Sequence, residues 1–152
     1  MKKQWLLVTI LLAIVLIGVV WYLASPLFID KTVDEKLPVI NSEANPSLTT
    51  LYEGNFIDAD NFHKTSGKAI VFDSDGKKYL RFEDFQATNG PDLKVYLSND
   101  LDAQDYISLG DLKGNIGDQN YEINDDIDLD NYNNVLIWCE QFSVLFGNAQ
   151  LE

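Results

Sequence analysis

The chain of 152 residues has little of the chemistry that builds metal clusters, because it contains one Cys and one His. A disulfide needs two cysteines, and an iron–sulfur cluster or a structural zinc site needs about four Cys or His ligands. A blue-copper centre needs two His and one Cys. The composition therefore excludes each of these sites within one chain.

Positive charge is also scarce, since 11 Lys and Arg stand against 24 Asp and Glu, for a net charge of -13. An acidic chain repels phosphates, so we expect no nucleic-acid partner. The sequence has no GxSxG motif, and glycines 110, 114 and 117 do not follow the dinucleotide-binding spacing. We recognise no catalytic constellation, and whether the protein is an enzyme stays open.

One long hydrophobic run is present, and it covers residues 5–23 without a charge. As a helix these 19 residues span about 28 Å, close to the hydrocarbon thickness of a bilayer. The run is longer than the core of a cleaved signal peptide, and no small-x-small cleavage site follows it. We therefore expect a transmembrane anchor, with a cleaved signal peptide as the alternative.

Charge on the two sides of this run predicts the topology. Lys2 and Lys3 precede it, so residues 1–4 are expected to be a cytoplasmic tip. The rest would then lie outside the cytoplasm, in a single-pass protein of the cell membrane whose anchor contacts lipid. All 24 acidic residues follow the run. This charge favours solubility and repulsion from anionic lipid, and the alternative is a surface that binds a cation or a partner.

Residues 24–47 predict a linker or stalk, because they hold three of the four prolines, mixed charges and no sustained period. Residues 48–152 predict an all-β domain. Short apolar stretches alternate with polar positions, and Asp75-Gly76 suits a tight hairpin turn. We expect a β-sandwich-like domain of seven or eight short antiparallel strands. Ile127 and Leu129 alternate with acidic residues and predict a half-buried edge strand.

Seven blocks of this domain carry a family resemblance: residues 54–56, 62–69, 80–85, 89–98, 109–121, 135–139 and 142–147. In this order they resemble a DM13 domain, a family labelled "electron transfer DM13" that is similar to the DOMON superfamily. The resemblance implies an extracytoplasmic β-sandwich-like module. It also implies a redox role centred on the family's characteristic cysteine, here Cys139.

Cys139 has two interpretations from its own surroundings. Strand alternation places it on one face with Val135 and Ile137, which is typical of a small buried hydrophobe. A redox thiol is favoured by cationic neighbours, whereas Trp138 and Glu140 flank this one. A lone thiol also needs a partner thiol or a sulfenic acid to cycle. The residues favour a structural cysteine, and the resemblance makes a redox cysteine an equal alternative.

His63 lies in one of the matching blocks and is the candidate cofactor-binding residue, with a surface or capping role as the alternative. Together with Cys139 it could hold haem iron or a metal. Haem-binding DOMON relatives are expected to use a Met/His pair, whereas the only methionine here is Met1, and no CxxCH motif is present. The sequence therefore argues against haem, and no cofactor is evident.

Three acidic clusters raise the question of calcium: Asp73-x-Asp75, Asp100-x-Asp102 and Asp126-x-Asp128-x-Asp130. The last lacks the glycine and the closing Glu of an EF-hand loop. We interpret all three as solvated acidic surface and predict no metal site.

Two functions of different classes follow. The first is a membrane-anchored redox or electron-transfer accessory that acts through Cys139 on a redox protein. The second is a non-catalytic binding or adhesion module that engages a cell-envelope protein or a cation, with a structural cysteine.

Overall fold

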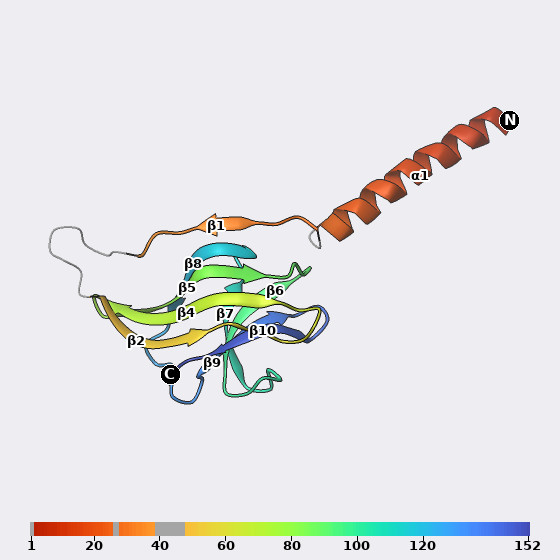
Figure 1. Ribbon diagram of the computed structural model, residues 1–152. Coiled ribbons are helices and arrows are strands. Elements are labelled where there is room, and N and C mark those ends of the chain that lie inside the picture. The colour runs from red at the N-terminus through yellow and green to blue at the C-terminus, as the bar shows by residue number, and fades with distance from the viewer. Residues whose placement is uncertain (1, 26–27, 39–47) are drawn as a thin grey trace.

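A computed structural model describes residues 2–25, 28–38 and 48–152 (Figure 1). The described residues form one helix, α1 (Lys2–Ala24), and ten strands in two five-stranded sheets. The first sheet has the order β1-β8-β5-β4-β2, and the second has the order β3-β10-β9-β6-β7. The strands are β1 (Thr32–Asp34), β2 (Leu48–Asn55), β3 (Ile57–Asp58), β4 (Thr65–Ser74), β5 (Lys77–Ala87), β6 (Leu93–Ser98), β7 (Tyr106–Asp111), β8 (Ile116–Ile123), β9 (Asn134–Cys139) and β10 (Val144–Gln150). The predicted all-β domain behind one apolar helix is confirmed.

Helix α1 stands apart from the sheets and is apolar on all sides. Its segment Gln4–Tyr22 is long and apolar enough to cross a membrane, and none of that window is buried against the rest of the chain. An apolar helix that finds no protein partner needs another apolar environment.

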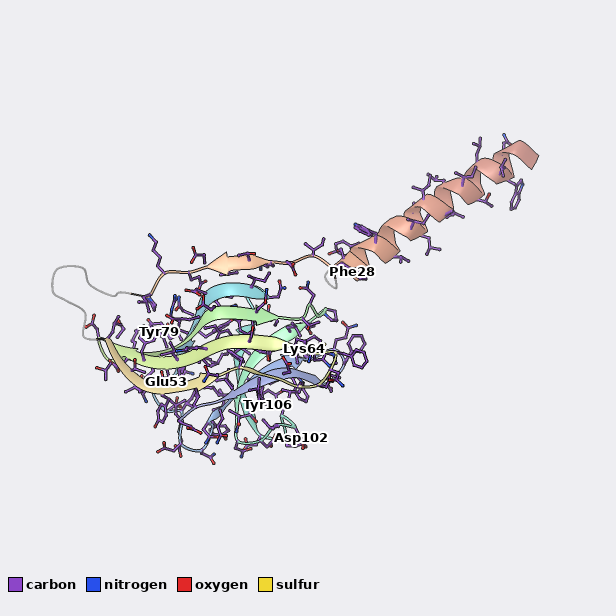
Figure 2. The ribbon with its side chains drawn as sticks, in the orientation of Figure 1. Phe28, Glu53, Lys64, Tyr79, Asp102 and Tyr106 are labelled. Atoms are coloured by element: carbon purple, nitrogen blue, oxygen red, sulfur yellow. The ribbon has the colours of Figure 1, made fainter. Side chains whose placement is uncertain are left out.

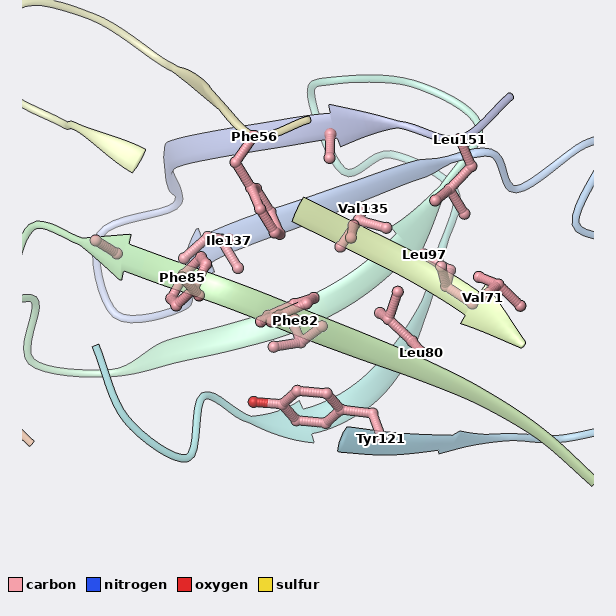
Figure 3. Close-up of a cluster of buried hydrophobic side chains, with 14 of the residues drawn as sticks. Phe56, Val71, Leu80, Phe82, Phe85, Leu97, Tyr121, Val135, Ile137 and Leu151 are labelled. Carbon is pink, nitrogen blue, oxygen red and sulfur yellow. The ribbon is translucent and has the colours of Figure 1, made fainter. Parts of the chain in front are cut away.

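The core lies between the two sheets and comes from alternating positions that face inward (Figure 3). Phe82 on β5 lies at its centre, fully buried. Its ring centroid is 4.8 Å from that of Phe56, 4.9 Å from that of Phe85 and 5.3 Å from that of Tyr121. These offset and edge contacts suit aromatic rings, so the four side chains join segments that are distant in sequence.

The hairpin predicted at Asp75-Gly76 joins β4 and β5. Asp75 has a φ of 53° and Gly76 a φ of 82°. Two successive positive φ angles match the right-handed twist of the flanking strands. The Asp73 carboxylate accepts the N–H of Gly76 at 2.9 Å, which stabilises the turn.

The edge strand predicted around Ile127 and Leu129 is wrong, because this segment forms successive turns. The Asp128 carboxylate accepts the N–H groups of Asp130 and Asn131. Such side-chain bonds offer the backbone an alternative to strand pairing. Leu129 still reaches the core, so its burial was predicted correctly but its conformation was not.

The stretch interpreted as a stalk contains a strand. Residues Thr32–Asp34 form β1, which pairs in parallel with Ile116–Asp118 of β8 at the edge of the first sheet. The prolines and mixed charges concealed this strand, which has a single half-buried apolar residue, Val33. Residues 26–27 and 39–47 of the predicted stalk lie outside the described residues, as does Met1 of the predicted tip.

Candidate functional site

Cys139 is the last residue of β9 and lies opposite Leu93 of β6 and Val144 of β10. Its thiol is free, and its exposed fraction is 0%. It belongs to the same core cluster as Val135 and Ile137, which confirms the shared face predicted from the alternation. The central position in the sheet follows from the apolar run of β9, whose residues Val135–Ile137 are buried on both faces.

The residues on either side of Cys139 point away from the core. Trp138 is half-buried on the outer face, and the exposed Glu140 carboxylate lies 3.6 Å from Lys94 Nζ. Among the described residues no hydrogen bond reaches Cys139 Sγ. The thiol is therefore surrounded by apolar packing. A reagent or a partner thiol can reach it only after a local opening of the sandwich.

His63 lies in the loop of residues 59–64, which an acidic side chain organises. Asp60 accepts the N–H groups of Phe62 and His63 at Oδ1, and its Oδ2 lies 2.8 Å from His63 Nδ1. These contacts lower the pKa of Asp60 to about 2, with the largest effect from the side-chain hydrogen bond to His63 and smaller effects from the two backbone N–H groups. The His63 ring packs on Phe146, with 4.2 Å between ring centroids. In this loop the Asp60 carboxylate, and not His63, accepts the backbone N–H groups, so the surface or capping role stays an alternative prediction for His63.

His63 and Cys139 are both linked to the core of the sandwich, but no direct contact between them is found among the described residues. Phe146 contacts the His63 ring and belongs to the core cluster that contains Cys139. No hydrogen bond joins the two side chains within the described part of the chain. There, too, no group of three or more His, Cys, Asp or Glu side chains is arranged to hold a metal ion. The role of His63 as a cofactor ligand therefore stays a prediction. Its Nδ1 atom is already hydrogen-bonded to Asp60.

In each predicted acidic cluster one carboxylate accepts N–H groups of the turn that follows it, while Asp130 accepts the hydroxyl of the distant Tyr52 at 2.8 Å. Asp100 accepts the N–H groups of Asp102 and Gln104, as Asp73 and Asp128 do for the turns that follow them. These bonds are typical of Asx turns.

A polar network at the β8 edge was missed by sequence reasoning. Arg81 alternates with the apolar residues Leu80 and Phe82 along β5, a pattern typical of a solvent-facing position, but the structure buries it, with 6% of its surface exposed. Its guanidinium forms ion pairs with two carboxylates, that of Glu83 at 2.8 Å and that of Asp118. It also donates hydrogen bonds to Asn120 Oδ1 at 3.0 Å and to the Glu35 carbonyl at 2.9 Å. The segment that follows β1 covers this side chain through the Glu35 carbonyl.

Glu35 is the charged centre of this cover. Lys113 Nζ lies 2.9 Å from both of its carboxylate oxygens, and the Asn120 N–H donates to Oε2 at 2.8 Å. Burial acts to raise the pKa of Glu35, but the bonds from Lys113 and Asn120 outweigh it and lower the pKa. No local sequence signal joins Glu35 to residues more than 75 positions away, so only the fold could reveal this network.

Two glycines let the β1 segment approach the sheet edge. A Cβ on Gly117 would lie 2.1 Å from the Val33 carbonyl oxygen, and a Cβ on Gly114 would lie 2.4 Å from that of Lys31. Asn115 completes the contact, because its Oδ1 accepts the Lys31 N–H and its Nδ2 donates to Asp30. We call residues 30–36 the strap. It is held by backbone pairing, buried amides and ion pairs.

One of the comparisons with known proteins finds a matching protein family. The family model described as Electron transfer DM13 matches residues 55–151. This range covers both sheets from the end of β2 onward and includes His63 and Cys139, while the strap lies before it. No curated protein and no solved structure matches the chain.

Proposed function

Because the chain belongs to the electron transfer DM13 family, we propose that it is a membrane-anchored electron-transfer accessory whose β domain works outside the cytoplasm. The observation that carries this proposal is the family match, which extends over nearly the whole two-sheet domain. The apolar segment Gln4–Tyr22 supports the anchor. Lys2 and Lys3 before it support a cytoplasmic N-terminus.

Cys139 is the candidate redox group within this proposal. Thiol–disulfide exchange requires a sulfur atom to attack another sulfur directly, so access decides the rate. Since Cys139 is fully buried at the end of β9, an exchange reaction has to follow an opening of the turn between β9 and β10. Such a thiol would react slowly in the resting protein and quickly with a partner that holds the turn open.

The redox proposal is tested with the full chain in detergent, as wild type and as Cys139→Ala. Prolonged incubation with glutathione disulfide is expected to convert the free wild-type thiol to a mixed disulfide, with release of one glutathione thiol. A reductive titration of this oxidised protein is then expected to show uptake of an electron pair as the mixed disulfide is cleaved back to two thiols, and the variant should show none. Far-ultraviolet circular dichroism checks that both chains keep their strand content. Equal electron uptake by the two folded proteins would remove Cys139 from the proposal, and no uptake by either would overturn the electron-transfer role.

The second candidate function is a non-catalytic binding module in which Cys139 is structural. The complete burial of Cys139 beside Val135 and Ile137 favours it. The rate of reaction with an aromatic disulfide, measured on native and on urea-unfolded chain, distinguishes the two functions. A thiol that reacts only after unfolding, in a chain that takes up no electrons, supports the binding module.

The topology has its own test in sealed vesicles. Protease added outside right-side-out cell vesicles is expected to reach the β domain. A C-terminal domain that stays intact until the vesicles are opened would place it in the cytoplasm and overturn this part of the proposal.

A further inference from the structure

The strap brings one end of the sandwich close to α1. Asp30 Oδ1 accepts hydrogen bonds from Asn89 Nδ2 and from Asn115 Nδ2, both at 2.8 Å. Five residues separate Ala24, the last residue of α1, from Asp30, so these two residues are at most about 22 Å apart. The Ser25 carbonyl accepts the N–H groups of Phe28 and Ile29, which shortens the reach further. The domain is therefore held near the end of the helix.

Three loops meet at this end, which we call the proximal end: residues 59–64, 88–92 and 140–143. The Thr88 N–H donates to the Lys64 carbonyl, which joins the first two loops. The Glu140 N–H donates to the Asp92 carbonyl, which joins the second and third. In Figure 1, α1 leaves the domain on the side where β5 ends, and Figure 2 shows Lys64 on that side and Asp102 farther from α1.

The proximal end carries the two most exposed large apolar side chains of residues 48–152. Phe62 is 83% exposed and Phe142 is 63% exposed, each at the tip of a loop. Phe28, between α1 and the strap, is 74% exposed. At the opposite end of β6, Leu101 is 46% exposed. Exposed phenylalanines on loop tips have no role in the core, so their position beside the helix requires another explanation.

Charge at the proximal end is compatible with a lipid surface although the domain as a whole is acidic. The Asp58 carboxylate pairs with Lys64 at 2.9 Å, and the Asp60 carboxylate forms a hydrogen bond with His63 at 2.8 Å. Lys94 Nζ pairs with three carboxylates, those of Asp92, Asp111 and Glu140, so this end keeps part of its negative charge. Local pairing weakens the repulsion that unpaired carboxylates would meet at lipid head groups.

We propose that the proximal end is a membrane-contact surface, and that Phe62 and Phe142 enter the interfacial layer of the bilayer that α1 spans. Exposed phenylalanine rings are stabilised at the boundary between head groups and acyl chains, because they leave water there without giving up a hydrogen bond. The inference rests on the proposed anchor and adds an orientation to it. In this orientation the Cys139 end of β9 faces the bilayer, so an electron-transfer partner would reach the domain along the membrane.

The test measures the depth of spin labels on the full chain in phosphatidylcholine vesicles. Spin labels attached at Asn61→Cys and Gln141→Cys lie next to the two phenylalanines, which stay in place. A label at Asp102→Cys, on a distant exposed loop, is the control. All three variants also carry Cys139→Ala, so that each has a single cysteine for labelling. The ratio of collisions with oxygen to collisions with an aqueous nickel chelate is expected to be several-fold higher at 61 and 141 than at 102. Phe62→Ser together with Phe142→Ser is expected to remove this difference.

The outcomes separate the inference from the anchor. Vesicle flotation reports the anchor, and a chain that does not float overturns both. A floating chain with equal ratios at all three labels overturns the membrane contact and leaves the anchor standing. The labels at 61 and 141 could instead be shielded from both oxygen and the nickel chelate, and more strongly at higher protein density. That result would indicate contact with a second copy of the chain and would also overturn the membrane contact.

Discussion

The interior between the two sheets and the β8 edge of the first sheet bury side chains by different chemistry. Around Cys139 and Phe82 the buried groups are mostly apolar, and the Tyr121 hydroxyl, which donates to Gln119 Oε1 at 2.7 Å, is an exception. At the β8 edge the buried groups are Arg81, Asn115 and Asn120, each with several hydrogen-bond partners. The interior depends on apolar area removed from water, and the edge depends on charge and hydrogen-bond geometry.

Because of this difference, the stability of the domain and the attachment of the strap depend on different groups of residues. The interior lies within the family match and holds the two sheets together. The edge holds the strap, the segment that lies between α1 and the rest of the domain in the chain. Damage to the interior should therefore unfold the domain, while damage to the edge should first release the strap.

The largest effect is expected for Phe82→Ala, which removes the central ring of the interior. Truncation of a buried phenylalanine leaves a cavity and should lower the free energy of unfolding by about 3–5 kcal/mol. Urea denaturation of the full chain in detergent, followed by near-ultraviolet circular dichroism, measures the change. A loss below about 1 kcal/mol would mean that the interior packs less tightly than the contacts of Phe82 indicate.

Arg81→Met tests the edge and should cost less, about 2 kcal/mol, because its partners Glu83 and Asp118 keep 38% and 30% of their side-chain surface exposed. Amide hydrogen exchange should report loss of protection at β1 before loss at β9. Lys77→Met is the matched control, since it breaks the pair with Glu122 in which both side chains are more than half exposed. The control should leave both protection and unfolding unchanged. Equal loss of protection at β1 and β9 in the Arg81 variant would contradict the separation of the two regions.

Cys139→Ser and Cys139→Ala compare a polar and an apolar replacement at one interior site. The serine hydroxyl would be buried without a partner at a cost of about 1–3 kcal/mol, whereas alanine leaves only a small cavity that costs about 1 kcal/mol. Thermal unfolding of the two variants should therefore rank alanine above serine. A serine variant as stable as wild type would show that this site tolerates polar groups and is not purely apolar.

The smallest effect is expected from acid at the strap. The pKa of Glu35 is lowered in the folded chain, so its stabilising contribution is present above the ordinary value of 4.5 and is lost as the pH falls through the folded pKa. Protection factors for the Asn120 amide should decrease from pH 5 to pH 3 while those of β9 stay constant. Glu35→Gln should remove this pH dependence, and a dependence that persists in the variant would assign it to another carboxylate.

Sequence reasoning predicted the interior well because its signals are local. The alternation in β5, β6 and β9 and the Asp75-Gly76 turn each occupy a few consecutive residues, and backbone geometry converts them directly into strand faces. The burial of Cys139 was accessible in this way. The turns at Ile127 and Leu129 could not be predicted in this way, because an Asx turn and an edge strand share the same alternation of acidic and apolar residues.

What the sequence alone determined is the apolar span of α1, the all-β class, the family and the inward face of Cys139, since each depends on composition or on a short period. Only the tertiary structure decided that Arg81 is buried, that the His63 ring packs on Phe146, and that the predicted stalk adds a strand to β8. These features arise where segments separated by tens of residues meet. A polar residue does not reveal from its neighbours in sequence whether water or another part of the chain will satisfy it.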